Sequence, residues 1–388
     1  MGKKKDRKPL IDYIRSIDEK VLSKIDLNRS LSNKPKEIAI EDYLKDTNRY
    51  KKFLLIDCRS EKEFRENSIP GFSNFPILTD SERDDVGFLY KHFSKQGAIY
   101  LALEYAKKKL EKLNQFVLDH NKKDIIVHCW RGGGRSMATA HFLIGMGYNV
   151  YKISGGIKSF RRVVYNQFYE DSSNLSFLIL SGLTGSGKTE ILEYLEGKLP
   201  IFNIEKAADH ASSLFGKIRF GLEEKVYTQM KFETNLFREI CFNGSFTKPM
   251  ISESESKNIH KFKLPENIFN NLVKSPTIVV DTSLEVRSKR IVKDYFKGKK
   301  PKEVYNVLES SRFLKKIIGG NNQKMLLKMI EEKKYYEFSE WFLKNYYDKR
   351  YSSSYSNVVA TFNGDNIEKC IDRVVDFYED RLKQCKKI

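Results

Sequence analysis

A cysteine follows a short apolar run and precedes three glycines that stand between two arginines, in IIVHCWRGGGRS at residues 125–136. The loop after Cys129 consists of Trp130, Arg131, Gly132, Gly133, Gly134, Arg135 and Ser136. Loop N–H groups, the start of a helix and nearby arginines all stabilise a thiolate anion. Two chemistries fit such a site: the thiolate attacks a phosphate monoester, or it carries a sulfur or selenium atom and passes it on. The C-x5-R spacing alone does not choose between them.

A second loop has the pattern of a phosphate-binding site. The sequence GLTGSGKT, residues 182–189, matches G-x-x-x-x-G-K-[ST] and stands between an apolar strand-like run and a helix-like run. The expected phosphate-binding residues are Gly182, Thr184, Gly185, Ser186, Gly187, Lys188 and Thr189. Backbone N–H groups would face the anion, with Lys188 on its outer oxygens and the Thr189 hydroxyl on Mg²⁺. The pattern leaves the reaction open between nucleotide hydrolysis, phosphoryl transfer and loss of a diphosphate leaving group.

Candidate metal ligands are few. Asp281 closes the apolar run TIVVD and could hold the same Mg²⁺ through water, or it could cap the following helix. The five cysteines form no CxxC pair and have no metal-ligand spacing, so we expect no zinc or other structural metal site.

The amino-acid composition indicates the cellular compartment of the protein and the kind of molecule that it binds. The chain has 388 residues, which suggests two domains, and 70 Lys+Arg against 51 Asp+Glu give a formal charge of +19. Such a balance favours a polyanionic partner, with nucleic acid first and an anionic membrane surface second. Scattered cysteines indicate a reducing compartment, and no segment approaches the ~20 apolar residues of a membrane span. We therefore expect a cytoplasmic protein without a membrane partner.

Short apolar strands alternate with helix-like stretches along the chain. The expected strands are 53–60, 124–129 and 149–156, followed later by 177–181, 276–281 and 357–363, with a helix from there to about residue 383. This order predicts an α/β protein with parallel sheets, whose active residues lie at the carboxyl ends of strands. We expect a charged lead-in at 1–35, a first domain at 36–168, a linker at 169–176, and a second domain at 177–388 with a Lys-rich helical region.

The first domain resembles the rhodanese family. LLIDCRSEKEFRENSIPGFSNFP is similar to the upstream rhodanese signature, and ISGGIKSF to the terminal Gly-Gly turn of that family. The resemblance implies that Asp57 and Arg59 brace the fold beside the active loop and that Cys129 carries a chalcogen. The same fold hosts some phosphatases, so phosphatase chemistry stays open.

A rhodanese-like domain followed by a phosphate-loop domain narrows the family. With HCWRGGGRS, GLTGSGKTE and the blocks at 75–98, 202–216, 229–236 and 251–265, the chain resembles the bacterial tRNA 2-selenouridine synthases. The block at 202–216 departs from that family where His210-Ala211-Ser212-Ser213 replaces an expected His-Arg-Gly-Ser, which puts an arginine contact in doubt.

The resemblance implies a two-stage reaction on the wobble 2-thiouridine of tRNA. The sulfur is first geranylated from geranyl diphosphate, and the S-geranyl group is then displaced by selenium from selenophosphate. Cys129 would carry selenium, Arg131, Arg135 and the loop amides would stabilise anions, and the phosphate loop would hold the diphosphate, a nucleotide or selenophosphate.

The resemblance therefore implies that this positively charged protein binds tRNA at its anticodon region. We expect contacts at 297–302 and at Arg161-Arg162, and Trp130 could stack on an extruded base or simply pack. The alternative function is a cysteine-dependent phosphatase fused to a nucleotide-binding domain, which would need no RNA. A nucleotide-driven RNA-binding switch is a third reading, in which Cys129 is dispensable.

Overall fold

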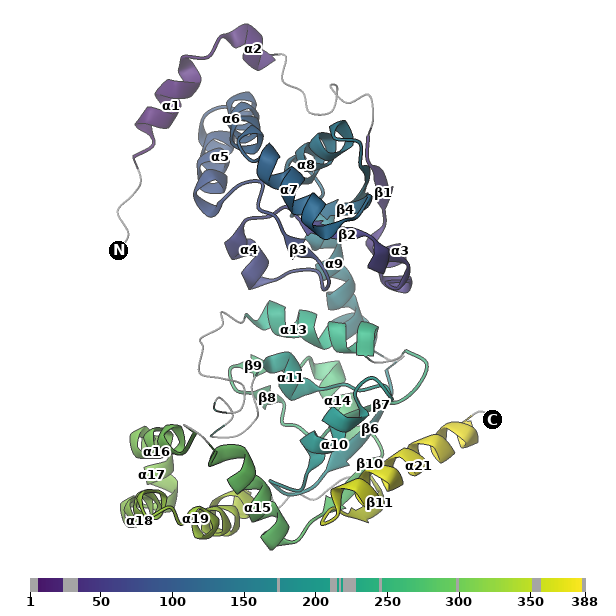
Figure 1. The fold of residues 1–388 in the computed structure, drawn as a ribbon, viewed down its shortest axis with the longest axis vertical. Helices are drawn as coiled ribbons and strands as arrows, with labels where there is room; N and C mark the ends of the chain where they lie inside the picture. Colours follow the sequence, from purple (N-terminus) through teal and green to yellow (C-terminus); the bar gives the residue numbers. More distant parts are fainter. Residues whose placement is uncertain are drawn as a thin grey trace. The chain divides into compact units, whose positions relative to one another are not determined.

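The structure is a computed structural model (Figure 1). It describes residues 6–23, 34–172, 175–209, 215, 218, 228–243, 246–297, 300–350 and 357–385. The chain divides into two compact units, Met1–Asn166 with Val226–Thr234, and Gln167–Lys225 with Asn235–Ile388. The segment Val226–Thr234 thus belongs to the first unit although it follows the phosphate loop in the sequence.

A five-stranded parallel sheet forms the centre of the first unit. Its strands are β1 (Lys36–Ile38), β2 (Leu54–Asp57), β3 (Ser73–Asn74), β4 (Asp124–His128) and β5 (Asn149–Ile153). They are hydrogen-bonded in the order β1-β5-β4-β2-β3, and every pair is parallel. Since β2 and β4 are neighbours, their carboxyl ends bring Asp57 opposite His128 and place the cysteine loop at that edge.

Helices precede, connect and follow the strands of this sheet. They are α1 (Lys8–Arg15), α2 (Glu19–Ser23), α3 (Ile40–Lys45), α4 (Glu61–Glu66), α5 (Asp80–His92), α6 (Lys95–Lys107), α7 (Leu110–His120), α8 (Gly134–Gly145) and α9 (Gly156–Tyr165). Apolar residues of β2, β4, β5, α7 and α8 form one core, including Ile56, Leu113 and Leu143, which are fully buried. The charged lead-in is partly helical, and Ile14 of α1 packs with Leu89 and Leu101 of α5 and α6.

The second unit contains a four-stranded parallel sheet. Its strands β6 (Phe177–Ser181), β7 (Met250–Glu253), β10 (Thr277–Asp281) and β11 (Val358–Asn363) are ordered β11-β10-β6-β7. A separate antiparallel pair consists of β8 (Asn258–Ile259) and β9 (Phe262–Lys263). The phosphate loop follows the central strand β6, so residues at the ends of β7 and β10 flank it. The expectation of an α/β protein with parallel sheets is confirmed in both units.

The helices after β6 are α10 (Lys188–Leu195), α11 (Ile204–Ala208), α13 (Gln229–Arg238), α14 (Glu266–Lys274), α15 (Leu284–Tyr295), α16 (Lys300–Ser310), α17 (Arg312–Ile318), α18 (Gly320–Glu331), α19 (Tyr335–Phe342), α20 (Asp348–Arg350) and α21 (Ile367–Cys385). Figure 1 shows α21 and α10 beside the sheet, and both contribute to its core with Ile191, Leu192, Val374 and Tyr378. Among the described residues, no helix combines the length and the apolar character that crossing a membrane requires.

Helices α15 to α20 form a lobe with its own aromatic core. Phe296, Phe338 and Phe342 are buried there, and the rings of Phe338 and Phe342 are stacked with centroids 5.5 Å apart. The lobe contains the expected Lys-rich helical region of the second domain, in which the apolar residues Val304, Leu308 and Leu314 are fully buried. Period-3.6 spacing of these apolar residues therefore gives a packed helical lobe.

Candidate functional site

The cysteine loop lies between the end of β4 and the start of α8, and the first turn of α9 holds two of its carbonyl groups. The oxygens of Cys129 and Trp130 accept N–H bonds from Ile157 and Lys158, at 3.0 and 3.1 Å. A trans peptide is planar, so its N–H points opposite to its C=O. The next N–H groups therefore turn away from the Gly-Gly turn, toward the inside of the loop.

Gly156 makes this close approach possible. A Cβ at this position would collide with the backbone of Cys129, and the residue has φ +59°, which L side chains rarely adopt. The second glycine of the turn after β5 is thus needed because the backbone of the cysteine loop packs directly against it.

The thiol itself lies at the bottom of the loop. Cys129 is 3% exposed, and its Sγ is 3.2 Å from the hydroxyl of Ser136, whose proton is donated to the carbonyl of Gly133. Trp130 is 43% exposed and Arg131 is exposed, so both stand at the outer face of the loop. The arrangement can hold an anionic sulfur or selenium between donors, with access past Trp130 and Arg131.

Arg135 is bound by a carboxylate from another element. Its two terminal nitrogens donate to the two oxygens of Glu63, at 2.5 and 3.1 Å. Ser60 caps α4 and donates its N–H and hydroxyl to the same carboxylate. Burial raises the pKa of Glu63, but the hydrogen bonds and charge of Arg135 outweigh burial and hold the pKa at about 2. The carboxylate is therefore ionised and fixes the direction of the arginine.

Asp57 and Arg59 form a buried pair beneath the loop. The arginine donates to both carboxylate oxygens, with Nη2–Oδ2 at 2.6 Å, and also to the carbonyl of Asn67. His128 is fully buried, its Nε2 lies 3.5 Å from Asp57 Oδ2, and burial lowers its pKa below the ordinary value. This network ties β2, α4 and β4 together just below Cys129, where the sequence places a structural brace.

Lys152 contacts the loop from β5 and was not singled out from the sequence. It is 5% exposed, donates to the carbonyl of Gly132 at 3.0 Å and pairs with Glu37 of β1 at 2.9 Å. Hydrogen bonds from Ser154 and Lys152 lower the pKa of Glu37. The side chains of NVYKI alternate between the two faces of the sheet, which is consistent with Lys152 pointing inward. Its counterion, Glu37, lies near it because β1 pairs with β5.

The phosphate loop is held in a similar way, by two arginines of α15. Arg287 donates to the carbonyl of Thr184 at 3.2 Å and pairs through both terminal nitrogens with Asp348. Arg290 donates to the carbonyl of Ser186 at 2.7 Å and to that of Gly364 at 2.8 Å. These carbonyls therefore face outward, and the loop amides are left to face a phosphate.

Gly182 begins this loop with φ +146°, and a Cβ there would lie 2.5 Å from the carbonyl oxygen of Val280 on β10. Lys188 donates to the carbonyls of Gly182 and Leu183, at 2.7 and 3.3 Å. Burial lowers the pKa of Lys188, and the carboxylates around it oppose that shift. The lysine thus lies across the concave side of the loop, where its ammonium would meet phosphate oxygens.

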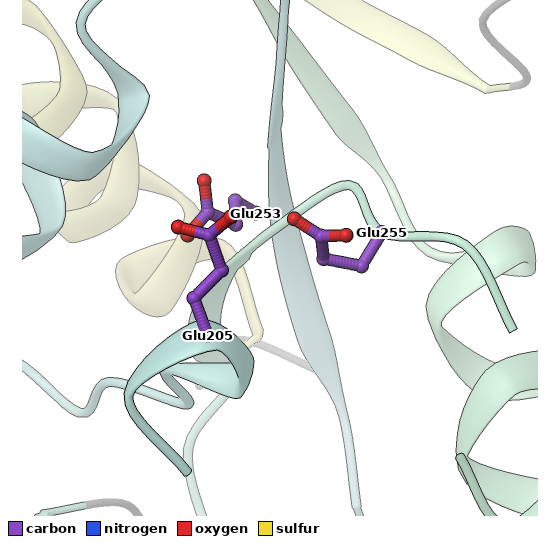
Figure 2. A group of neighbouring side chains, drawn as sticks. All are labelled: Glu205, Glu253 and Glu255. Carbon is purple, nitrogen blue, oxygen red and sulfur yellow. The ribbon is translucent and has the colours of Figure 1, made fainter. Parts of the chain in front are cut away.

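Three glutamates gather beside the loop (Figure 2). Glu205 of α11, Glu253 at the end of β7 and Glu255 each offer an oxygen within 4.8 Å of the others. The Thr189 hydroxyl donates to Glu253 at 3.4 Å. Oxygen donors of this kind fit a hard divalent cation such as Mg²⁺. The sequence indicated Thr189 but not the glutamates, although Glu253 ends the apolar run PMISE next to β6.

Asp281 lies elsewhere around the loop. Its side chain is exposed, and its carbonyl accepts the N–H of Gly364 at 2.7 Å. The helix that follows is capped by Ser283, whose hydroxyl accepts from Val286. The structure therefore brings Glu253, and not Asp281, to the Thr189 hydroxyl.

Comparisons with known proteins match the two parts of the chain to two family domains. The family described as the tRNA 2-selenouridine synthase AAA domain matches residues 175–383, and the rhodanese-like domain matches 41–162. The first match covers more than half of the chain. The chain belongs to the tRNA 2-selenouridine synthase family. The Cys129 loop thus lies in the rhodanese-like part of this family member, and the phosphate loop in its AAA part.

Individual relatives carry the same name. A tRNA 2-selenouridine synthase of Nitrosomonas europaea is 34% identical over 248 residues, 62% of this chain and 63% of the relative. That of Bdellovibrio bacteriovorus is 34% identical over 251 residues, 62% of this chain and 64% of the relative. The chain thus spans less than two thirds of the length of these relatives. A solved rhodanese-related protein from Thermoplasma volcanium covers 33% of this chain and 92% of its own, at 22% identity and a TM-score of 0.21.

The other cysteines and the expected RNA-contact residues lie in different environments. Cys58 is fully buried, as expected of a core residue, and burial raises its pKa. Burial also raises the pKa of Cys241, to about 12, and that of Cys370. Arg161, an expected RNA contact, donates a hydrogen bond to Glu233 at 2.6 Å, so its charge is paired with a carboxylate of the first unit. Arg162, the other expected contact, is exposed. Residues 210–213, 298–299 and the side chain of Cys385 lie outside the described residues.

Proposed function

We propose that this chain converts wobble 2-thiouridine in tRNA to 2-selenouridine through an S-geranyl intermediate. The observation that carries the proposal is the family match over both parts of a chain in which a cysteine loop and a phosphate loop each have two carbonyls held by residues outside the loop. Each loop thereby presents amides to an anion, as a selenium donor and a diphosphate require. We further place the protein in the cytoplasm, where tRNA is modified.

In the first stage the phosphate loop would bind the diphosphate of geranyl diphosphate. The thiocarbonyl sulfur of the uridine forms a bond to the first carbon of the geranyl group, and the carbon–oxygen bond to diphosphate breaks. Lys188 and the loop amides stabilise the departing anion. Mg²⁺, held by Thr189 and Glu253 with Glu205 and Glu255 nearby, would supply further charge neutralisation.

In the second stage the cysteine loop would provide selenium derived from selenophosphate. The Cys129 thiolate would form a bond to C2 of the base, and the S-geranyl group leaves as a thiolate, which is a better leaving group than the unalkylated sulfur. Selenium of selenophosphate then forms the bond to C2 as the Cys129 thiolate leaves, and water breaks the selenium–phosphorus bond to release phosphate. The loop amides and Arg131 would hold the selenophosphate anion, and the Ser136 hydroxyl, 3.2 Å from the sulfur, would turn its proton from the Gly133 carbonyl to the thiolate. Arg135 would act through its fixed position beside Glu63.

Nucleoside mass spectrometry tests the proposal. Thiolated tRNA is incubated with geranyl diphosphate and selenophosphate, with wild type and with Cys129→Ala. We expect 2-selenouridine from wild type and accumulation of the geranylated nucleoside with the variant. Unchanged nucleosides together with hydrolysis of a phosphate monoester by wild type would show instead that the cysteine loop is a phosphatase site.

A further inference from the structure

The helical lobe contains a continuous basic stretch. Residues 310–330, SSRFLKKIIGGNNQKMLLKMI, include no aspartate or glutamate, and their cations are Arg312, Lys315, Lys316, Lys324 and Lys328. The stretch forms α17 and α18. A block of one sign of charge on packed helices creates a local positive potential that attracts polyanions.

One face of α17 combines these charges with apolar surface. Leu314 and Ile318 turn into the core of the lobe, and Arg312, Lys315 and Lys316 are exposed. On the same exposed side, Phe313 is 54% exposed and Ile317 is 42% exposed. We call Arg312, Phe313, Lys315, Lys316 and Ile317 the α17 face.

The charges of this face are not compensated within the part of the chain that the structure describes. There, Arg312, Lys315 and Lys316 make no ion pair, whereas Lys328 of α18 lies 3.7 Å from Glu332. The guanidinium of Arg350 lies over the rings of Phe313 and Tyr346, at 5.3 and 5.5 Å from their centroids. A further cation therefore stands beside the exposed phenyl ring.

We propose that the α17 face binds a single-stranded or looped segment of RNA. Lysine and arginine would neutralise phosphates, and the Phe313 ring would stack on a base. The inference rests on the proposed function, in which the RNA is tRNA. It places a tRNA-binding surface on α17, whereas the sequence analysis expected RNA contacts at 297–302. A membrane fits less well, because α17 has seven residues and exposes only Phe313 and Ile317 as large apolar side chains.

The test measures tRNA binding by the full chain over a salt series. The double variant Lys315→Gln/Lys316→Gln removes two charges from the face, and Lys107→Gln/Lys108→Gln removes two exposed charges from the α6 end as its control. We expect the face variant to weaken binding and to lower the slope of log affinity against log salt by about 1.4. The α6 variant should keep the wild-type slope.

Phe313→Ala separates stacking from charge. We expect about a tenfold loss of tRNA affinity with an unchanged salt slope. Tyr90→Ala, which removes a 53% exposed ring on α5, is the control and should bind as wild type. With modification as the readout, the face variants should raise KM for tRNA and leave kcat unchanged.

Three results would overturn the inference. Equal losses in the face and control variants would show that bulk charge alone binds RNA. Face variants that bind tRNA normally but lose binding to phosphatidylserine vesicles would show a membrane surface instead. Wild type that does not bind tRNA would overturn this inference together with the proposed function. Wild type that binds tRNA through the α17 face but modifies no nucleoside would overturn the function alone and support the surface.

Discussion

The two terminal nitrogens of Arg135 bind the two carboxylate oxygens of Glu63, a residue 72 positions earlier in the chain. The arginine of the C-x5-R pattern is thus committed to a carboxylate of α4, and its charge is largely offset. Arg131, whose side chain is exposed, is the cation of the loop that stays available to an incoming anion.

Glu63→Gln should destabilise the first unit. The substitution leaves Arg135, which is 18% exposed, without its anionic partner, so we expect a loss of about 3 kcal/mol in the free energy of unfolding. Urea unfolding measures this loss. Glu61→Gln on the exposed side of α4 is the control and should change stability by less than about 0.5 kcal/mol. Equal stabilities of the two variants would contradict the role given to the pair.

The same pair predicts acid sensitivity. The folded pKa of Glu63, about 2, is below its ordinary value of 4.5, so its contribution is fully present above pH 4.5. The contribution is lost as pH falls from 4.5 through 2, because the unfolded chain binds the proton first. Wild type should therefore lose more stability than Glu63→Gln across this window in denaturant titrations at fixed pH values. Parallel pH profiles of the two proteins would argue against it.

Lys152→Met should reduce the attraction of the cysteine loop for anions. The buried ammonium bonds to the carbonyl of Gly132, so its removal lowers the positive potential at Cys129. We expect alkylation by iodoacetate to slow by about three- to tenfold relative to alkylation by neutral iodoacetamide. Lys158→Met, which replaces an exposed lysine of α9, should leave that ratio unchanged. A general loosening of the loop would instead shift both rates together.

Gly156→Ala should disrupt the close packing of the cysteine loop against residue 156. The new methyl would meet the backbone of Cys129 at a residue with φ +59°, and we expect a cost of about 3 kcal/mol or more. Gly145→Ala in α8, where a Cβ meets nothing within 4 Å, should be neutral or stabilising by up to about 1 kcal/mol. Thermal unfolding of both variants checks the difference, and similar melting temperatures would be inconsistent with it.

Glu253→Gln should weaken divalent-cation binding more than Asp281→Asn. Glu253 lies at the Thr189 hydroxyl with two further carboxylates, whereas Asp281 is exposed at the end of β10. With Mn²⁺ as a spectroscopic probe, we expect about a tenfold or greater loss of affinity for the first variant and little change for the second. A larger loss of Mn²⁺ affinity in Asp281→Asn than in Glu253→Gln would indicate instead that Asp281 binds the metal.

Much of the fold and of the two loops followed from local sequence patterns. Apolar runs such as DIIVH and FLILS predicted strands because a parallel strand buried on both faces needs continuous apolar residues. Gly156 and Gly182 mark positions where backbone must approach backbone. The resemblance to the family rested on such short segments, and the family match confirmed it.

Only the tertiary structure decided which distant groups complete the loops. Glu63, Lys152 and Glu253 are ordinary charged residues in the sequence. They reach the loops because β2, whose following helix holds Glu63, and the strands β5 and β7 pair with their particular neighbours. Sequence spacing specifies contacts within a turn or a helix, since these depend on a fixed number of residues. Contacts across a sheet depend on strand order and register, which no local pattern encodes, and so the counterions of Arg135 and Lys152 emerged only from the folded chain.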